Sequence, residues 1–197
     1  MTDLQKKNRV VIVDDEPIII MNITEILTDN GFDVLGSAGN GYQAIELCEK
    51  VRPDILLMDI NIPYLDGLTA AEYIVKEGNA EAVVMVTAYS EGSLIERAIN
   101  FGAFGYIIKP IDEKTLISTI NVAVAKSREI SILKNEIREA ELKIEGRKKI
   151  ERAKGILMVS KNYSEQKAYE YIREKSRDNQ MSMEKIADII IFGEKKC

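Results

Sequence analysis

The sequence predicts a doubly wound α/β domain with a five-stranded parallel sheet, followed by a long helix and a small all-α module of three helices. Three observations lead to this prediction. Short β-branched apolar runs alternate with amphipathic stretches over residues 1–125. Proline is absent from residue 113 onward, where apolar residues recur at helical spacing. Acidic residues dominate residues 1–125 and basic residues dominate residues 141–197, which indicates two functional units.

Five apolar runs predict the strands of the first unit. Each run is nearly continuous, as expected of a parallel strand that is buried on both faces. The runs are 10–13, 33–36, 55–58, 83–86 and 106–108. Between them, helix-like stretches at 17–30, 68–77 and 90–101 are each followed by glycine, a helix stop signal. Five repeats of strand and helix in about 120 residues predict a doubly wound, flavodoxin-like parallel sheet.

Reactive side chains follow four of these runs. Asp14 and Asp15 come after the first, Asp59 after the third, Thr87 after the fourth and Lys109 after the fifth. An aspartate after a strand commonly serves as a helix N-cap or turn residue, and that reading fits each aspartate alone. Because the carboxyl ends of parallel strands meet at one edge, the set of five is expected to share one crevice.

Three carboxylates in one crevice repel each other and favour a divalent cation. Ligation by oxygen alone suits Mg²⁺, which is therefore the predicted cofactor. A carboxylate beside Mg²⁺ and a lysine can attack phosphorus, since both cations screen the charge of the incoming phosphoryl group. Asp59 is the predicted nucleophile because it stands alone on the central strand, whereas Asp14 and Asp15 form a pair.

The composition excludes several classes of site. The chain has no histidine, which rules out Ser-His-Asp and Cys-His catalysis, imidazole-ligated zinc and a phosphohistidine relay within the chain. Two cysteines, Cys48 and Cys197, predict no disulfide framework. The sequence has neither a run of 18 apolar residues nor an apolar segment in its first ten residues, so we expect a cytoplasmic protein without a membrane span.

Residues 8–125 resemble the receiver domains of two-component response regulators. The matching strings are VIVDDEP, LLMDINIPYLDG, VTAY and YIIKP. The resemblance implies that Asp59 accepts a phosphoryl group from a sensor histidine kinase. It also implies that Asp14, Asp15 and the backbone carbonyl of Asn61 hold Mg²⁺ together with Asp59. The domain is expected to end near residue 125.

The same resemblance assigns the remaining residues of the site. Thr87 would hydrogen-bond the phosphoryl oxygens, and Lys109 would form an ion pair with them. Tyr106 matches an aromatic residue that turns inward when the threonine moves, although a tyrosine without a switching role remains an alternative. Ile62 replaces the more usual methionine, one apolar residue for another. The loop after the phosphoacceptor is matched by Pro63, Asp66 and Gly67.

Residues 126–146 predict a coiled-coil linker. Apolar residues there are spaced by 3, 4, 3 and 4, and isoleucine at one core position with leucine or alanine at the other favours a parallel dimer. The alternative is an amphipathic helix that packs on its own domain. The predicted dimer seam consists of Ile130, Leu133, Ile137, Ala140 and Ile144.

Residues 147–192 predict a module of three helices, followed by a tail at 193–197. Ser164 is the expected N-cap of the second helix and Ser182 of the third. The expected packing face of the second helix contains Ala168, Tyr169, Ile172 and Ser176. That of the third contains Ile186, Ala187, Ile189 and Ile190.

Basic residues in this module, interleaved with tyrosines, suit binding to phosphates and unpaired bases of RNA. A solvated helix face is the alternative when charge alone is considered. The tyrosines are Tyr163, Tyr169 and Tyr171. The candidate RNA-binding residues are Lys148, Lys149, Arg152, Lys154, Arg173 and Lys175.

The C-terminal residues resemble an ANTAR domain, the RNA-binding output module of antitermination regulators. The strings ERAKGILM and YSEQKAYEYIREKS carry the resemblance. Ser176 departs from it, since the family more often has alanine there. Ala153 and Gly155 are small enough for close helix packing, and Gly155 inside a helix costs about 1 kcal/mol relative to alanine.

The sequence therefore predicts a phosphorylation-dependent response regulator that binds hairpins in nascent mRNA as a homodimer and prevents transcription termination. A DNA-binding response regulator is the alternative. It would need a polar base-reading helix, whereas residues 183–190 are short and mostly apolar. We expect no enzymatic activity beyond phosphoryl transfer to Asp59 and its hydrolysis.

Overall fold

A computed structural model describes residues 7–88 and 92–194 of the chain. The chain divides into two units, residues 1–131 and 132–197, and each unit is described by itself. Within the described residues, no helix is both long enough and apolar enough to cross a membrane.

The first unit contains the predicted five-stranded parallel sheet. The strand order is β2-β1-β3-β4-β5, so β3 lies at the centre of the sheet. Every residue of β3 and β4 is buried, which explains their continuous apolar sequences. The strands are β1 (Arg9–Val13), β2 (Asp33–Ala38), β3 (Ile55–Asp59), β4 (Ala82–Thr87) and β5 (Gly105–Ile108).

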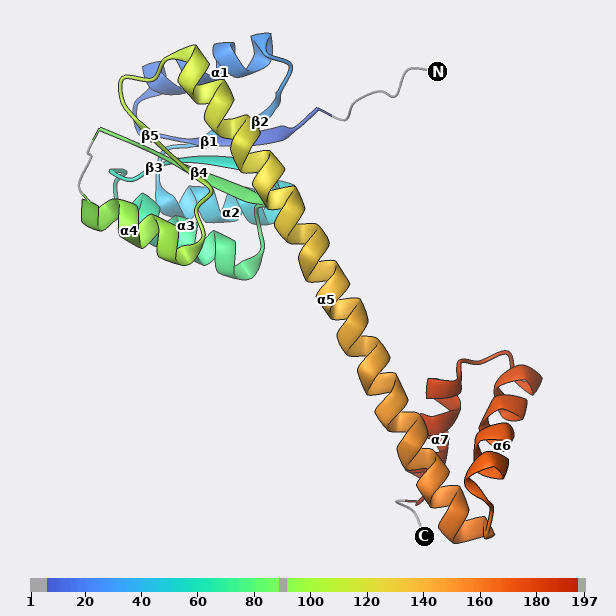
Figure 1. The fold of residues 1–197 in the computed structure, drawn as a ribbon. Coiled ribbons are helices and arrows are strands. Elements are labelled where there is room, and N and C mark those ends of the chain that lie inside the picture. Colours follow the sequence, from blue (N-terminus) through green and yellow to red (C-terminus); the bar gives the residue numbers. More distant parts are fainter. Residues whose placement is uncertain (1–6, 89–91, 195–197) are drawn as a thin grey trace, which may run out of the picture. The chain divides into compact units, whose positions relative to one another are not determined.

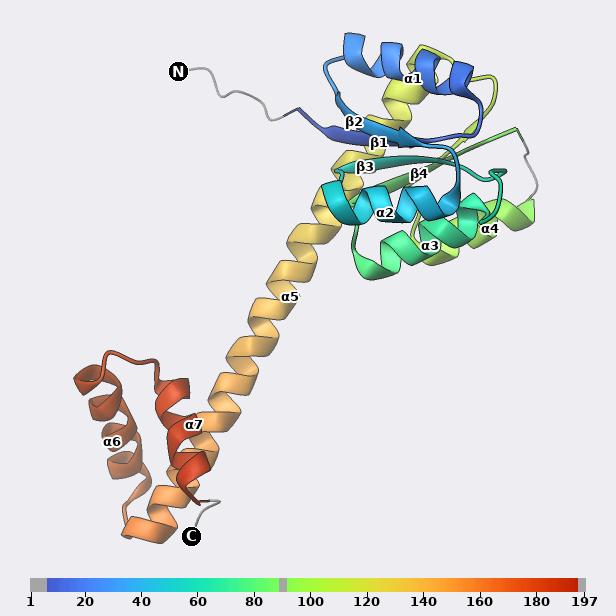
Figure 2. The same ribbon diagram turned by 180° about the vertical axis from the view of Figure 1, so that it is seen from behind.

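Helices cover both faces of the sheet. Helix α1 (Pro17–Asp29) and the first turns of α5 (Glu113–Lys161) lie on one face (Figure 1). Helices α2 (Gly41–Val51), α3 (Gly67–Glu77) and α4 (Gly92–Phe101) lie on the other, as the view from behind also shows (Figure 2). Each face has its own apolar core, so the fold is the doubly wound sandwich that the sequence predicts.

The predicted helix positions are largely confirmed. Gly31, Gly78 and Gly102, the three glycines proposed as stop signals, have φ values of 82°, 67° and 96°. The predicted start of a helix at Ser90 lies outside the described residues. The sequence did not single out α2, although its start is marked by Asn40, whose side-chain oxygen accepts a hydrogen bond of 3.0 Å from the Gln43 backbone N–H.

The second unit contains the last turns of α5 together with α6 (Glu165–Asp178) and α7 (Met183–Glu194). Ser164 and Ser182 each accept a 3.2 Å hydrogen bond from the backbone N–H three residues later, which confirms both predicted N-caps. A small apolar core joins the three helices. Its buried residues are Ala153, Leu157, Ala168, Ile172, Ile186 and Ala187.

Two residues placed on packing faces from the sequence prove to be exposed. Tyr169 is 44% exposed and Ile189 is 54% exposed. Helix α6 buries only Ala168 and Ile172, and α7 buries only Ile186 and Ala187. The packed stripe is narrower than the sequence suggested: each helix turns only two fully buried residues towards the core, and Tyr169 and Ile189 lie beside that stripe.

Candidate functional site

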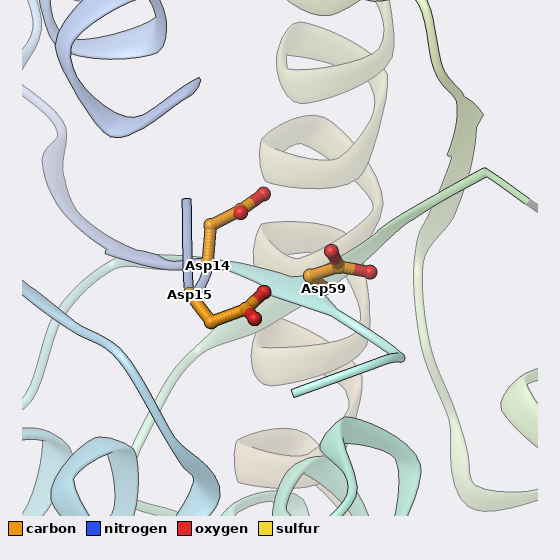
Figure 3. A group of neighbouring side chains, drawn as sticks. All are labelled: Asp14, Asp15 and Asp59. Atoms are coloured by element: carbon orange, nitrogen blue, oxygen red, sulfur yellow. The ribbon is translucent and has the colours of Figure 1, made fainter. Parts of the chain in front are cut away.

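Three aspartates gather at the carboxyl edge of the sheet, as predicted. Asp14 and Asp15 follow β1, and Asp59 is the last residue of β3 (Figure 3). One carboxylate oxygen from each lies within 4.8 Å of the others. Asp14 and Asp59 are buried, whereas Asp15 is exposed at the mouth of the group. The register of β1 against β3, which pairs Val13 with Met58, brings the two strand ends together.

Backbone hydrogen bonds orient the two buried carboxylates. The Glu16 N–H donates to Oδ1 of Asp14 at 3.0 Å, and the Asn61 N–H donates to Oδ1 of Asp59 at 3.2 Å. Each donor lies two residues after its acceptor, which is the geometry of an Asx turn. The turn immediately after each strand therefore holds the carboxylate towards the shared pocket.

Lys109 bridges the same two aspartates. Its Nζ lies 2.7 Å from Oδ2 of Asp14 and 2.7 Å from Oδ2 of Asp59. Burial of the ammonium group acts to lower the pKa of Lys109, but its hydrogen bonds to the two carboxylates outweigh burial and raise that pKa above its usual value. Lys109 is thus held as a cation between two anions. Glu16, which the sequence reading missed, is 3.9 Å from the same nitrogen.

Thr87 and Tyr106 lie on the two strands beside the pocket. Thr87 ends β4 and is buried, and its carbonyl accepts a 2.8 Å hydrogen bond from the Lys109 N–H. Tyr106 lies on β5, opposite Met85 in the strand pairing, and packs partly buried against the core that faces α2, α3 and α4. Thr87, at the end of β4, and Lys109, directly after β5, therefore lie at the carboxyl edge of the sheet, and Tyr106 lies three residues before Lys109 on β5.

Gly67, at the end of the loop after Asp59, has almost no free space around its α-carbon. The Gly67 N–H donates to the carbonyl of Ile60 at 2.9 Å. A Cβ atom on Gly67 would lie 1.8 Å from the carbonyl oxygen of Asp59, so only glycine fits at this position. Ile62 is buried in the adjacent core, consistent with the expected apolar substitution. The matched glycine therefore lets the loop pack directly against the backbone of the predicted phosphoacceptor and of the residue that follows it.

Asp66 forms the N-cap of α3 in this loop. Its Oδ1 accepts a 2.9 Å hydrogen bond from the Thr69 N–H. Partial burial acts to raise the pKa of Asp66, but the hydrogen bonds from Thr69 and the charge of Arg97 together lower it below its usual value. The resemblance matched Asp66 to this loop, and the structure shows that its side chain caps α3.

The donor set at this edge fits Mg²⁺. The atoms that face one another are carboxylate oxygens, which are hard ligands, and the set contains no thiol or imidazole. Asp15 is the solvent-exposed member of the set. The pocket therefore combines three acidic groups with one fixed lysine, the combination expected where a carboxylate accepts a phosphoryl group.

The candidate RNA-binding residues fall into two groups. Lys148, Arg152 and Arg173 are exposed, and no carboxylate of the described residues lies within 4.0 Å of their charged groups. They are free to contact a polyanion.

The other three candidates are already ion-paired. Lys149 Nζ lies 3.1 Å from Asp188, and Lys175 Nζ lies 3.2 Å from Asp178. The side chain of Lys154 is only 9% exposed, and its Nζ lies 2.9 Å from Glu151 and 2.8 Å from Glu165. Lys154 thus joins α5 to α6 instead of facing solvent. The sequence could not reveal this, since the second carboxylate comes from a different helix.

The predicted dimer seam is exposed along α5. Ile130, Leu133, Ile137 and Ile144 are 39–59% exposed, and Ala140 is exposed as well. None of these residues belongs to the apolar cores of the described residues. The seam is thus an apolar stripe without a partner inside the described chain.

Comparison with known proteins agrees with both halves of the sequence reading. The response regulator receiver domain matches residues 10–121, and the ANTAR domain matches residues 138–191. The transcriptional regulatory protein PdtaR of Mycobacterium tuberculosis is 36% identical over 189 residues, which cover 96% of this chain and 92% of that protein. The chemotaxis protein CheY of Bacillus subtilis is 39% identical over 58% of this chain and 95% of its own length.

Solved structures resemble the first unit. The receiver domain of a modulated diguanylate cyclase from Desulfovibrio desulfuricans superposes with a TM-score of 0.58 and 31% identity, covering 62% of this chain and 98% of that one. The response regulator domain of CheB from Thermotoga maritima gives a TM-score of 0.57 and 29% identity, covering 61% of this chain and 98% of that one.

Proposed function

Because the chain belongs to the response regulators that join a receiver domain to a C-terminal ANTAR RNA-binding domain, we propose that phosphorylation of Asp59 switches it to bind RNA hairpins as a dimer and prevent transcription termination. The only chemistry of the chain would be phosphoryl transfer to Asp59 and hydrolysis of the product. A sensor histidine kinase would supply the phosphoryl group.

The arrangement around Asp59 supports this chemistry. A carboxylate oxygen of Asp59 would attack phosphorus, forming an O–P bond as the bond from phosphorus to the donor's nitrogen breaks. Lys109 already lies beside that carboxylate and would pair with the added negative charge. Asp14, Asp15, Asp59 and the carbonyl of Asn61 would hold Mg²⁺, which supplies further charge compensation for the transferred group.

The switch is proposed to run through Thr87 and Tyr106. The Thr87 hydroxyl would hydrogen-bond a phosphoryl oxygen on Asp59, since it ends the strand beside β3. Tyr106, on the next strand, is half-buried and would turn further inward when Thr87 moves. This movement would alter the surface formed by β5 and the start of α5, and so promote dimerisation.

Helical geometry supports a dimer through the predicted seam. Ile144 of the seam and Ala153 of the module's core are nine residues apart, about two and a half turns, so they lie on opposite sides of α5. Ile137 lies about two turns before Ile144, on the same side as it. A second copy could therefore pair along the seam while α6 and α7 remain packed on the other side.

The observation that most strongly supports the proposal is that α5 is one continuous helix. Helix α5 runs without interruption from Glu113 to Lys161. Its first turns pack on the receiver sheet, and its last turns belong to the C-terminal module. The ANTAR match begins on this helix at residue 138. The predicted seam lies on the same helix, so the phosphorylated domain, the dimer contact and the RNA-binding domain share one element.

A binding and transcription experiment tests the proposal. The full chain, treated with beryllofluoride and Mg²⁺, is used to select RNA hairpins from a pool with random loops. We expect tight binding to selected hairpins, weak binding to duplex DNA of the same sequence, and increased read-through when a selected hairpin overlaps an intrinsic terminator. Preferential binding to the duplex would support the DNA alternative, and unchanged read-through would refute antitermination.

A further inference from the structure

Two lysines and two tyrosines form a cluster at the corner between α5 and α6. The Nζ of Lys161, the last residue of α5, lies 4.5 Å from the centre of the Tyr171 ring. The Nζ of Lys167, in the first turn of α6, lies 4.6 Å from the centre of the Tyr163 ring. The two rings are 5.9 Å apart and inclined at 59°. We call these four residues the corner cluster.

The lysines of the corner cluster have no acidic partner among the described residues. In the described part of the chain, no carboxylate lies within 4.0 Å of either ammonium group. An aromatic ring attracts a cation through its quadrupole and, unlike a carboxylate, does not neutralise it. Lys149, Lys154 and Lys175 in the same unit each face an acidic partner instead. The corner thus concentrates uncompensated positive charge.

The two tyrosines position the ammonium groups of Lys161 and Lys167 beside the core of the module. Both rings are partly buried against the apolar core that joins α5, α6 and α7. Tyr163 directly precedes Ser164, the N-cap of α6, and Lys161 Nζ lies 3.3 Å from the Tyr171 hydroxyl. A lysine that is already positioned loses less conformational entropy when it binds an anion than one that moves freely.

We propose that the corner cluster is an RNA phosphate site, additional to Lys148 and Arg152, at which Lys161 and Lys167 contact the RNA backbone. The inference rests on the proposed function, since it concerns RNA held by the same module. Arg152 and Lys161 are nine residues apart on α5, about 13 Å along the axis and about half a turn out of phase. The two sites therefore contact different phosphates, and their contributions should add.

The test removes the charges and keeps the side-chain stems. A double variant, Lys161→Met with Lys167→Met, is compared with wild type for binding to one selected hairpin across a range of KCl concentrations. We expect about tenfold weaker binding at moderate salt and a slope of log K against log salt reduced by about 1.4, the value for two lost phosphate contacts. Lys161→Arg with Lys167→Arg should retain most of the affinity and the slope.

The control removes two charges elsewhere. Lys50→Met with Lys76→Met changes the net charge equally, at exposed positions on α2 and α3 of the first unit. Thermal unfolding of each variant checks that the fold is intact. The inference is overturned if the corner variant, still folded, matches this control in both affinity and slope. Failure of wild type to bind any hairpin would instead reject the proposed function, and the corner site with it.

Discussion

The ammonium group of Lys109 lies 2.7 Å from Oδ2 of Asp59 and at the same distance from Oδ2 of Asp14. Asp14 follows β1, Asp59 ends β3 and Lys109 follows β5. The lysine can reach both carboxylates because the strand order places β1 and β3 side by side. One cation thus compensates two buried carboxylates. Phosphorylation of Asp59 would add negative charge beside Lys109 and so change the balance of charge at this contact.

Replacing Lys109 should destabilise the protein when Mg²⁺ is absent. In Lys109→Met the buried Asp14 and Asp59 would repel each other without a cation, at a cost of about 3 kcal/mol in the free energy of unfolding. Added Mg²⁺ should reduce the difference in the free energy of unfolding between variant and wild type. The ion binds the folded state and replaces the missing positive charge beside the two carboxylates. Urea unfolding in EDTA and in Mg²⁺ measures both effects. Equal stability of variant and wild type in EDTA would contradict the account.

Two glycine-to-alanine substitutions should have opposite effects on stability. Gly67→Ala places a methyl group 1.8 Å from the carbonyl oxygen of Asp59 and should cost about 3 kcal/mol. Gly155 was expected to allow close helix packing, yet among the described residues no atom beyond its chain neighbours and the nearby backbone of α5 would lie within 4 Å of its Cβ. Gly155→Ala should therefore stabilise the chain by about 1 kcal/mol. Thermal unfolding tests the pair, and a stabilised Gly67→Ala would refute the close approach.

A seam substitution should abolish dimerisation selectively. Ile137 and Ile132 are both 59% exposed on α5, but only Ile137 belongs to the predicted seam. Ile137→Glu places a charge at a core position and should keep the beryllofluoride-treated chain monomeric. Ile132→Glu adds the same charge off the seam and should leave the dimer intact. Sedimentation velocity distinguishes the two, and equal behaviour of both variants would argue against this seam.

The Asp66 cap should make a pH-dependent contribution to stability. Asp66→Ala removes the hydrogen bond to the Thr69 N–H and should cost about 1 kcal/mol near neutral pH. Because the pKa of Asp66 is lowered on folding, the contribution of its charge is present above the unfolded pKa, about 3.9, and is lost as pH falls through the folded pKa. The difference from wild type should thus shrink below about pH 4. A difference that grows on acidification would contradict this assignment.

The sequence predicted the five strands, the edge where the aspartates meet and the long helix, because these follow from local patterns. Continuous apolar runs marked β3 and β4, and the residue after each run marked the pocket. Rules for parallel sheets then brought Asp14, Asp59 and Lys109 together without any knowledge of distances.

The remaining features depend on contacts between distant residues. Lys154 looked like a surface lysine because its partner Glu165 lies on another helix. Tyr169 is partly exposed because α6 turns Ala168 and Ile172, not Tyr169, towards the core of three helices. The sequence showed three tyrosines among basic residues, but only the structure selects Tyr163 and Tyr171 as the pair that holds two lysines.

The most direct measurement is the affinity of the full chain for one selected hairpin, with and without beryllofluoride, in wild type and in Asp59→Asn. The account predicts that the phosphoryl analogue strengthens binding to wild type and has no effect on Asp59→Asn, because only the carboxylate at position 59 can hold it. Equal affinity of wild type in both conditions, or an equal response of Asp59→Asn, would contradict control of RNA binding by phosphorylation.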